Sequence, residues 1–264
     1  NLQEIQGPIT VVAGKKRRLT FIECEMDLPS MLDVGKVADL VLLMVSAEQG
    51  FTMDCFELLN ILQVHGFPKV IGILSHLDGF KDGKKLKTVR KELKQRFWTE
   101  LYQGAKLFNL MGMKHGRYMP RDVLNLSRFI SVVKLRPLSW RNAHPYAVAD
   151  RLEDLTPVEE VTRDPLADRT VCFYGYLRGT PLKLQAGVKQ IHIPGAGDFA
   201  ISELDFLDDP CPLPQTGNLK GRHLSDKQRL IYAPMSDLSG IVYDRDAIYI
   251  DMPTRKAHQA AKMA

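Results

Sequence analysis

In the first half of the chain, segments with the apolar pattern of strands alternate with segments that have the apolar spacing of helices. Segments with strand character cover residues 18–23, 37–46, 69–74 and 105–110, and the second of them is a nearly continuous apolar run. Between and after the later runs, residues 54–65, 84–101 and 122–134 have the apolar spacing of amphipathic helices. The run at 37–46 is typical of a strand buried on both faces of a sheet. Strands and helices that alternate in this way predict an α/β fold with a mostly parallel sheet.

The pattern changes after Pro137. Residues 137–168 are polar and interrupted by prolines, which predicts a connector. Even spacing and period-two alternation in the segments that follow predict a small antiparallel β-barrel over residues 169–252. Its expected strands are 169–178, 188–194, 198–204, 229–233, 240–244 and 247–252. Residues 208–228 are expected to form a polar loop and residues 253–264 a tail.

Composition narrows the class of protein. The chain has 264 residues, of which 45% are hydrophobic and 25% charged, as in globular proteins. Its longest apolar run is broken by Asp39 and is far shorter than the roughly 20 residues of a membrane span, so no membrane partner is expected. The 4 cysteines lack metal-ligand spacing and are predicted to be free thiols of an intracellular protein. The chain begins with Asn1 rather than methionine, which suggests that residues upstream are missing.

Positive charge is concentrated in the middle of the chain. Residues 81–141 contain 16 Lys/Arg against 4 Asp/Glu, whereas both flanks are net acidic. One interpretation is the solvated face of an amphipathic helix; the other is a contact with a polyanion such as RNA. We favour RNA contact, without sequence readout. The candidate residues are Lys81, Lys84, Lys85, Lys87, Arg90, Lys91, Lys94 and Arg96.

A polar segment directly after the predicted strand 69–74 is a candidate base-recognition site. It consists of Ser75, His76, Leu77 and Asp78. A carboxylate at a strand end can accept hydrogen bonds from N1–H and the exocyclic amine of guanine, which adenine cannot donate in this pattern. The alternative is an ordinary turn with Asp78 as a helix cap, and this segment alone fits that alternative better.

Two neighbouring segments favour nucleotide binding. Thr10 lies just before the first predicted strand pair, where a switch loop places a hydroxyl near a phosphate-bound Mg²⁺. Met111 and Gly112 close the strand 105–110, where backbone amides can reach a base carbonyl. The order of switch loop, base-reading loop and base-closing loop is that of a GTP-binding domain.

Longer strings of sequence resemble a known family. They are GPITVV at 7–12, GKKRRLT at 14–20, KVADLVLL at 36–43, RFWTE at 96–100, HPY at 144–146, ADR at 149–151, YGYLRG at 174–179 and YAPMS at 232–236. Over most of residues 1–252 the chain resembles the Bms-type ribosome-biogenesis GTPases. It is less similar to the related Tsr-type assembly factors.

This resemblance implies an incomplete P-loop GTPase-like G domain over residues 1–136, followed by a barrel like domain II of elongation factor Tu. It also implies binding of GTP or GDP with Mg²⁺, which Thr10 would contact. The implied GTP-binding residues are Thr10, Glu23, Ser75, His76, Asp78, Met111 and Gly112.

The sequence departs from a working GTPase at several positions. It has no phosphate loop, which in the family would precede Asn1, so the chain is expected to be an internal piece that binds nucleotide poorly and is inactive alone. Glu23 stands where the family pattern has the Mg²⁺-linked Asp, and Met26 replaces a Gly beside the γ-phosphate. Asp27 occupies the place of a water-orienting His, and His76 replaces a Lys that packs on guanine. Hydrolysis is therefore expected to be slow or dependent on partners.

By resemblance, the chain acts in the nucleus, in the nucleolar small-subunit processome (the 90S pre-ribosome) during early 40S assembly and 18S rRNA processing. The implied partners are pre-rRNA, small nucleolar RNA, processome proteins and an RNA 3′-terminal-phosphate-cyclase-like assembly factor. Two hypotheses stay open: a GTPase switch, and a non-hydrolysing G-like scaffold for RNA and proteins. A translation factor is a weaker third.

Overall fold

In the computed structural model the chain is described over residues 7–13, 17–136, 138–182, 190–213, 228–236 and 238–244. It divides into two compact units. Residues 24–144 form an α/β unit, and residues 1–23 with 145–264 form a second, mainly antiparallel unit. Residues 1–23 therefore group with the later strands, whereas the sequence suggested one continuous segment over residues 1–136.

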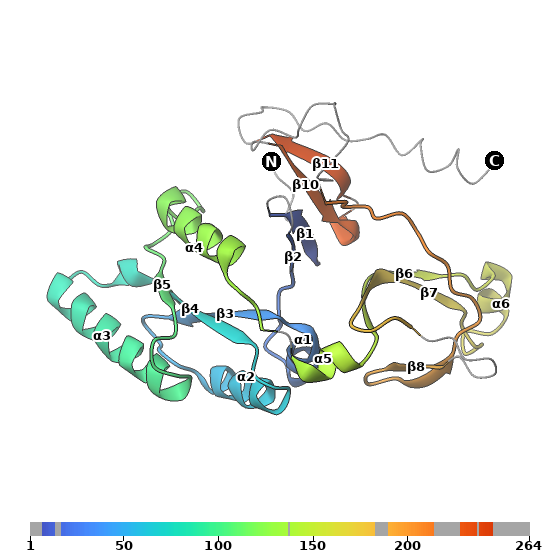
Figure 1. The fold of residues 1–264 in the computed structure, drawn as a ribbon, viewed down its shortest axis with the longest axis horizontal. Helices are drawn as coiled ribbons and strands as arrows, with labels where there is room; N and C mark the ends of the chain where they lie inside the picture. Colours follow the sequence, from blue (N-terminus) through green and yellow to red (C-terminus); the bar gives the residue numbers. More distant parts are fainter. Residues whose placement is uncertain are drawn as a thin grey trace. The chain divides into compact units, whose positions relative to one another are not determined.

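The α/β unit has the predicted alternation of strands and helices (Figure 1). Its elements are α1 (Leu28–Val37), β3 (Leu40–Ser46), α2 (Met53–Val64), β4 (Lys69–Ser75), the 3₁₀ turn η1 (Leu77–Gly79), α3 (Gly83–Glu100), β5 (Leu107–Asn109), α4 (Pro120–Val132) and α5 (Ser139–Ala143). The three strands form one parallel sheet in the order β3-β4-β5. The predicted α/β class is confirmed for this unit, in a G-like arrangement.

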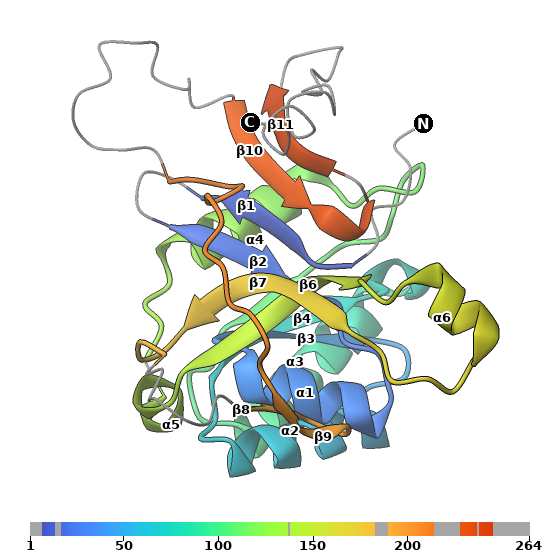
Figure 2. The ribbon, with the colours of Figure 1, turned by 90° about the vertical axis from the view of Figure 1, so that its right-hand side faces the viewer.

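Helices cover both faces of the parallel sheet. In Figures 1 and 2, α1, α2 and α3 lie on one side of it and α4 lies on the other. On the α4 side, the Phe108 and Phe129 rings pack with their centroids 5.3 Å apart. Such a two-sided cover explains why β3 and β4 are almost continuously apolar in sequence.

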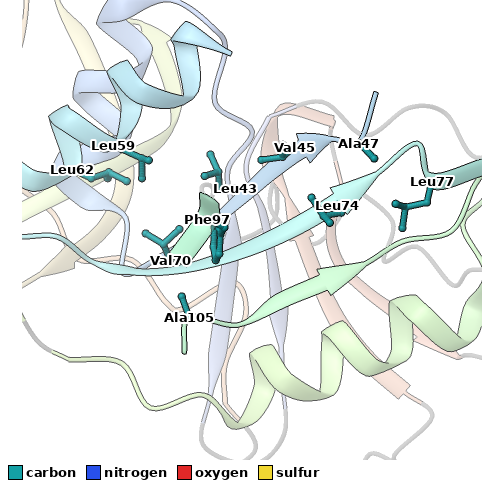
Figure 3. Packing of buried hydrophobic residues seen from close by; sticks show 10 residues of the cluster. All are labelled: Leu43, Val45, Ala47, Leu59, Leu62, Val70, Leu74, Leu77, Phe97 and Ala105. Carbon is teal, nitrogen blue, oxygen red and sulfur yellow. The ribbon is translucent and has the colours of Figure 1, made fainter. Parts of the chain in front are cut away.

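The main core lies between the sheet, α2 and α3. Its ten buried residues, shown in Figure 3, are Leu43, Val45, Ala47, Leu59, Leu62, Val70, Leu74, Leu77, Phe97 and Ala105. Phe97 of α3 is fully buried against β4. A Cβ atom on Gly72 would lie only 2.7 Å from the Phe97 ring and 2.5 Å from Cδ1 of Leu107. Glycine at the centre of β4 is therefore what allows the ring to lie directly on the strand.

Helix α1 was missed by the sequence analysis, and the strand predicted over 37–46 was partly wrong. Val37 is the last residue of α1, and the strand itself begins at Leu40. Asp27 is the N-cap, whose side chain accepts a hydrogen bond from the backbone amide of Ser30 at 3.3 Å. Pro29, in the first turn, has no amide proton to leave unsatisfied. These start signals are local and present in the sequence.

The antiparallel unit contains β1 (Ile9–Val12), β2 (Arg18–Phe21), β6 (Tyr146–Asp154), α6 (Val158–Arg163), β7 (Val171–Arg178), β8 (Gln190–Ile193), β9 (Gly197–Ala200), β10 (Gln228–Ala233), the 3₁₀ turn η2 (Pro234–Ser236) and β11 (Leu238–Asp244). A four-stranded sheet has the order β11-β10-β1-β2, and β6-β7 and β8-β9 are two-stranded. All pairings in this unit are antiparallel.

Three expectations for this unit are corrected. Strand β2, predicted in the parallel sheet, pairs instead with β1, because the short connection at 13–17 permits only an antiparallel hairpin. The described strands form open sheets, so the predicted closed barrel is not shown. Strand β6 lies inside the predicted connector 137–168. The predicted strand 247–252 and tail 253–264 fall outside the described residues.

Arg18 fixes the segment after β9 to the antiparallel unit. Its guanidinium donates to Oδ2 of Asp209 at 2.5 Å and to the carbonyl oxygen of Cys211 at 3.2 Å, and it lies 4.2 Å from the centre of the Tyr176 ring. The Tyr176 hydroxyl donates to the other Asp209 oxygen at 3.0 Å. Burial, together with this bond to Asp209, raises the pKa of Tyr176, so the tyrosine stays a donor.

Candidate functional site

The carboxyl ends of β3, β4 and β5 meet at one edge of the parallel sheet, where ligands of such sheets bind. Glu48 follows β3, Asp78 follows β4, and Met111 and Gly112 follow β5. Five of the predicted GTP-binding residues therefore belong to this edge: Ser75, His76, Asp78, Met111 and Gly112.

Ser75 and His76 set the course of the chain at this edge. Ser75 is buried, and its Oγ donates to the Val45 carbonyl at 3.4 Å and lies 3.1 Å from Nδ1 of His76. His76 has a φ of +54°, in the left-handed region that residues other than glycine seldom adopt. This reversal of the backbone leaves Leu77 buried and Asp78 exposed. The strained position is local support for a site here, because such backbone recurs at binding loops.

Asp78 and Gly112 are in direct contact. A Cβ atom placed on Gly112 would lie 2.0 Å from both Cγ and Oδ2 of Asp78. The Asp78 carboxylate therefore rests against the backbone of the loop that follows β5. Because Asp78 is solvent-exposed, its oxygens can accept hydrogen bonds from a ligand.

The loop after β5 is held by two hydrogen bonds that its backbone amides donate. The Leu110 amide donates to the Leu74 carbonyl at 2.8 Å, and the Met111 amide donates to Oδ2 of Asp122 at 3.3 Å. The Met111 amide, which was expected to reach a base carbonyl, thus has Asp122 of α4 as its partner in this structure. The predicted role of Met111 in base binding stays a prediction.

Two acidic residues at this edge were missed by the sequence analysis. A Cβ atom on Gly79 would lie 1.8 Å from Oε1 of Glu48, so the Glu48 carboxylate packs on η1, beside Asp78 in sequence. Glu48 lies two residues beyond the end of β3, and the rule that ligands bind at strand ends would have found it. Asp122 is in the first turn of α4, a position that the sequence already favours for an acid.

Thr10 and Glu23 belong to the antiparallel unit. Thr10 lies within β1 rather than in a loop, is buried, and has its hydroxyl 3.0 Å from that of Thr20. One hydroxyl already paired with another does not make a Mg²⁺ site, which needs several oxygen ligands. In the described ranges, no three His, Cys, Asp or Glu side chains gather to hold a metal. The Thr10–Mg²⁺ contact therefore stays a prediction that requires further ligands.

Asp27, at the position of the family's water-orienting histidine, has a structural role. Hydrogen bonds from Ser30 at the start of α1 lower its pKa, so it remains ionised in weak acid. Met26 beside it is strongly exposed; it keeps a backbone amide but lacks the conformational freedom of the family's glycine. The expected weak or partner-dependent hydrolysis stays a prediction.

Helix α3 carries the predicted RNA-contact residues on its solvent face. Lys84, Lys87, Lys91 and Lys94 recur at helical spacing and are all exposed. Lys81, Lys85 and Arg96 are also exposed, whereas Arg90 is half-buried. Among the described residues, the ion pair of α3 joins Arg96 to Glu100 at 3.8 Å, so most of the positive charge on this helix has no acidic partner there.

The four cysteines differ in their burial. Cys24, Cys55, Cys172 and Cys211 are free thiols, and burial raises the pKa of Cys211. Cys211, the one outside an apolar run, is the only fully buried cysteine of the four. Among the helices that the structure describes, none is both long and apolar enough to cross a membrane.

Comparison with known proteins gives two family matches. Residues 6–131 match the Tsr1 G-like domain, and residues 134–210 match the AARP2CN (NUC121) domain. The chain is 55% identical over 251 residues to a human protein named ribosome biogenesis protein BMS1 homolog, which covers 95% of the chain and 19% of that protein. It is 55% identical over 253 residues to ribosome biogenesis protein bms1 of Schizosaccharomyces pombe, covering 96% of the chain and 22% of that protein.

Similarity to the Tsr-type proteins is lower. The chain is 30% identical over 232 residues to the pre-rRNA-processing protein TSR1 homolog of Xenopus laevis, covering 85% of the chain and 26% of that protein. The greater resemblance to Bms-type than to Tsr-type proteins, expected from the sequence strings, is confirmed. The chain spans about a fifth to a quarter of the length of these relatives.

Proposed function

The chain belongs to the Bms/Tsr family of ribosome-biogenesis factors, and from this premise we propose that it acts in 40S assembly and 18S rRNA maturation as a guanine-nucleotide-responsive G-like module. The observation that carries this proposal is 55% identity over 95% of the chain to a ribosome biogenesis protein. At that identity, the fold and the residues of its sites are expected to be shared.

The contact between Asp78 and Gly112 supports guanine recognition. An exposed carboxylate seated on a glycine at the carboxyl edge of a parallel sheet is arranged to accept the N1–H and exocyclic amine of the base. We assign binding of the guanine base to Asp78. Ser75 and His76 would hold the loop that carries Asp78, and Met111 and Gly112 would close over the base. GTP or GDP would bind with Mg²⁺ only when a phosphate loop is present.

A non-hydrolysing scaffold is the second candidate. It is favoured by Met26 and by Asp27, which serves as the N-cap of α1 at the place where a catalytic histidine would be expected. In this alternative the nucleotide is structural or absent, and the basic face of α3 contacts pre-rRNA. The remaining proposed context is the nucleolus, the small-subunit processome, small nucleolar RNA and a cyclase-like assembly factor.

The role in ribosome assembly is tested by depleting the full-length protein that contains this chain and measuring 18S rRNA against large-subunit rRNA. We expect 18S rRNA to fall selectively and pre-rRNA precursors to accumulate, with rescue by the wild-type protein. An unchanged ratio of small- to large-subunit rRNA after depletion would show that the proposal is wrong.

Guanine recognition is tested in the full-length protein with Asp78→Asn. An asparagine amide can pair with xanthine but loses the charge-assisted pair with guanine, so we expect GTP affinity to fall by at least about 100-fold and XTP affinity to rise. Asp82→Asn is the control, because Asp82 caps α3 by accepting from the Lys84 amide. Equal GTP binding by both variants would exclude guanine readout by Asp78. If the wild-type protein binds no nucleotide yet supports 18S maturation, the scaffold is correct.

A further inference from the structure

The loop between β5 and α4 contains a small β-hairpin that the sequence analysis did not find. Lys114 and Arg117 pair through their main chains in both directions, with N···O distances of 2.8 and 3.1 Å. The two residues between them, His115 and Gly116, have φ angles of +52° and +73°. Two left-handed residues in a two-residue connection make the turn that fits the natural twist of a hairpin.

The hairpin is anchored at its base. The Met111 amide donates to Asp122, and Pro120 begins α4 three residues after Arg117. Gly112 packs on Asp78 at the edge of the sheet. The tip is thus a defined projection from the carboxyl edge, seen in Figure 2 as the green segment that leads into α4.

Like charges face each other across this hairpin. Lys114 and Arg117 are directly opposite, which places their Cβ atoms about 5 Å apart, and like charges in that position destabilise a strand pair. Both side chains and His115 are exposed, and no acidic residue occurs between Met111 and Arg121. Within the described part of the chain no carboxylate pairs with either cation. An external anion placed between the two cations would remove the repulsion.

We propose that the Lys114–Arg117 hairpin is a phosphate-binding tip that contacts the backbone of RNA. The main-chain pairing fixes the turn, which leaves the Lys114 ammonium and the Arg117 guanidinium to bind phosphate oxygens. His115 at the apex adds a third donor. Two further exposed lysines, Lys84 and Lys85, lie at the start of α3, which begins shortly after β4 ends at the same edge of the sheet. Because of these lysines we favour RNA over an acidic protein. This inference rests on the RNA contact that we propose for this chain above.

The test measures RNA binding by the whole chain with Lys114→Gln and Arg117→Gln combined. Both changes keep the main-chain hydrogen bonds and the two left-handed residues, so the hairpin should persist. The probe is a fluorescein-labelled 20-nucleotide oligouridine, titrated by fluorescence anisotropy between 50 and 200 mM KCl. The loss of two phosphate contacts should lower the slope of log K against log salt by about 1.4 and weaken binding by about tenfold at low salt.

The matched control is Lys106→Gln with Lys134→Gln. These lysines are exposed at the opposite edge of the same unit, before β5 and after α4, and their removal changes net charge equally. We expect the control and the exchange Lys114→Arg with Arg117→Lys to keep the wild-type salt slope. A hairpin variant that behaves like the control overturns the inference. So does a labelled 20-residue polyglutamate that binds as tightly as the RNA, because the tip would then be a general acid-binding surface.

A separate variant distinguishes failure of this inference from failure of the proposed function. Lys84→Gln, Lys87→Gln and Lys91→Gln remove the face of α3 and leave the hairpin intact. RNA binding that depends on α3 alone overturns the hairpin inference and leaves the proposed function standing. Wild-type protein that binds no RNA overturns the inference as well, whereas the depletion experiment on 18S rRNA decides the proposed function independently.

Discussion

The buried guanidinium of Arg141 binds the carboxylate of Asp39 at 2.7 Å and closes the C-terminal end of α1. The same group donates to the carbonyl oxygens of Val37 at 2.9 Å and Ala38 at 2.5 Å, which no helical amide satisfies. Arg141 is only 3% exposed, whereas the Asp39 side chain is nearly half exposed. One side chain of α5 therefore supplies the C-cap of a helix that lies about a hundred residues earlier.

Replacing Arg141 by methionine should destabilise the α/β unit by roughly 2–4 kcal/mol. The methionine would fill much of the space but would remove the guanidinium donors from two helix-end carbonyls and from the Asp39 carboxylate. Urea unfolding of the whole chain, followed by circular dichroism of the helices, measures the change. Arg96→Met is the matched control, because Arg96 makes an exposed pair with Glu100 within α3 and should cost only about 0.5 kcal/mol. Equal losses in the two variants would contradict the capping role.

Gly72→Ala should destabilise the same unit by about 1–3 kcal/mol through overpacking. The added methyl group would collide with the Phe97 ring and with Leu107, and neither can leave the filled core easily. Combining it with Phe97→Leu should recover part of the loss, so that the double variant is more stable than the sum of the single changes predicts. Urea midpoints of the four proteins give this coupling; strict additivity would show that the ring does not rest on Gly72.

The parallel sheet could be predicted because its signals are local. β3 and β4 are apolar runs in sequence, β4 is buried on both faces, and α3 and α4 show helical spacing. The pairing of β1 with β10 could not be predicted in this way, because Val11 and Ile231 come together only through tertiary contacts. The barrel was expected from strand spacing, yet spacing carries no information on whether a sheet closes.

The placement of candidate site residues was predictable where polar residues directly follow the ends of strands. Asp78 was selected because a carboxylate follows a buried strand, and its contact with Gly112 joins two such ends. The Gly and Pro before Thr10 predict a loop. In the structure Thr10 lies in β1, where buried and half-buried residues alternate, and it occupies a buried position. Lys114 was counted only as charge, since the left-handed His115 of its turn has no strong sequence signal beyond the following glycine.

Gly112→Ala should weaken guanine-nucleotide binding of the full-length protein with little loss of stability. Its Cβ would lie 2.0 Å from the Asp78 carboxylate and would push that exposed side chain away from the place where the base edge is proposed to bind. Nucleotide affinity should fall by about tenfold or more, toward that of Asp78→Ala. Gly83→Ala is the control, since a Cβ there meets no atom within 4 Å. Unchanged affinity in Gly112→Ala would remove the base-closing role from this loop.

Asp150→Asn should stabilise the antiparallel unit at neutral pH. Asp150 lies at the irregularity in the register of β6, is buried, and its Oδ1 has no hydrogen-bond partner. Burial raises its pKa above the ordinary value of 3.8. Both folded and unfolded chains carry the neutral acid at low pH, so the ionised carboxylate costs stability only as the pH rises above about 4. We expect the variant to unfold about 2–4 °C higher than the wild type at pH 7, and this difference in unfolding temperature to shrink toward zero below pH 4.

Asp198→Asn, at an exposed position beside His192, is the control and should not gain stability at pH 7. A difference for Asp150→Asn that stays constant from pH 3 to pH 7 would show that the charge of Asp150 is not what limits stability.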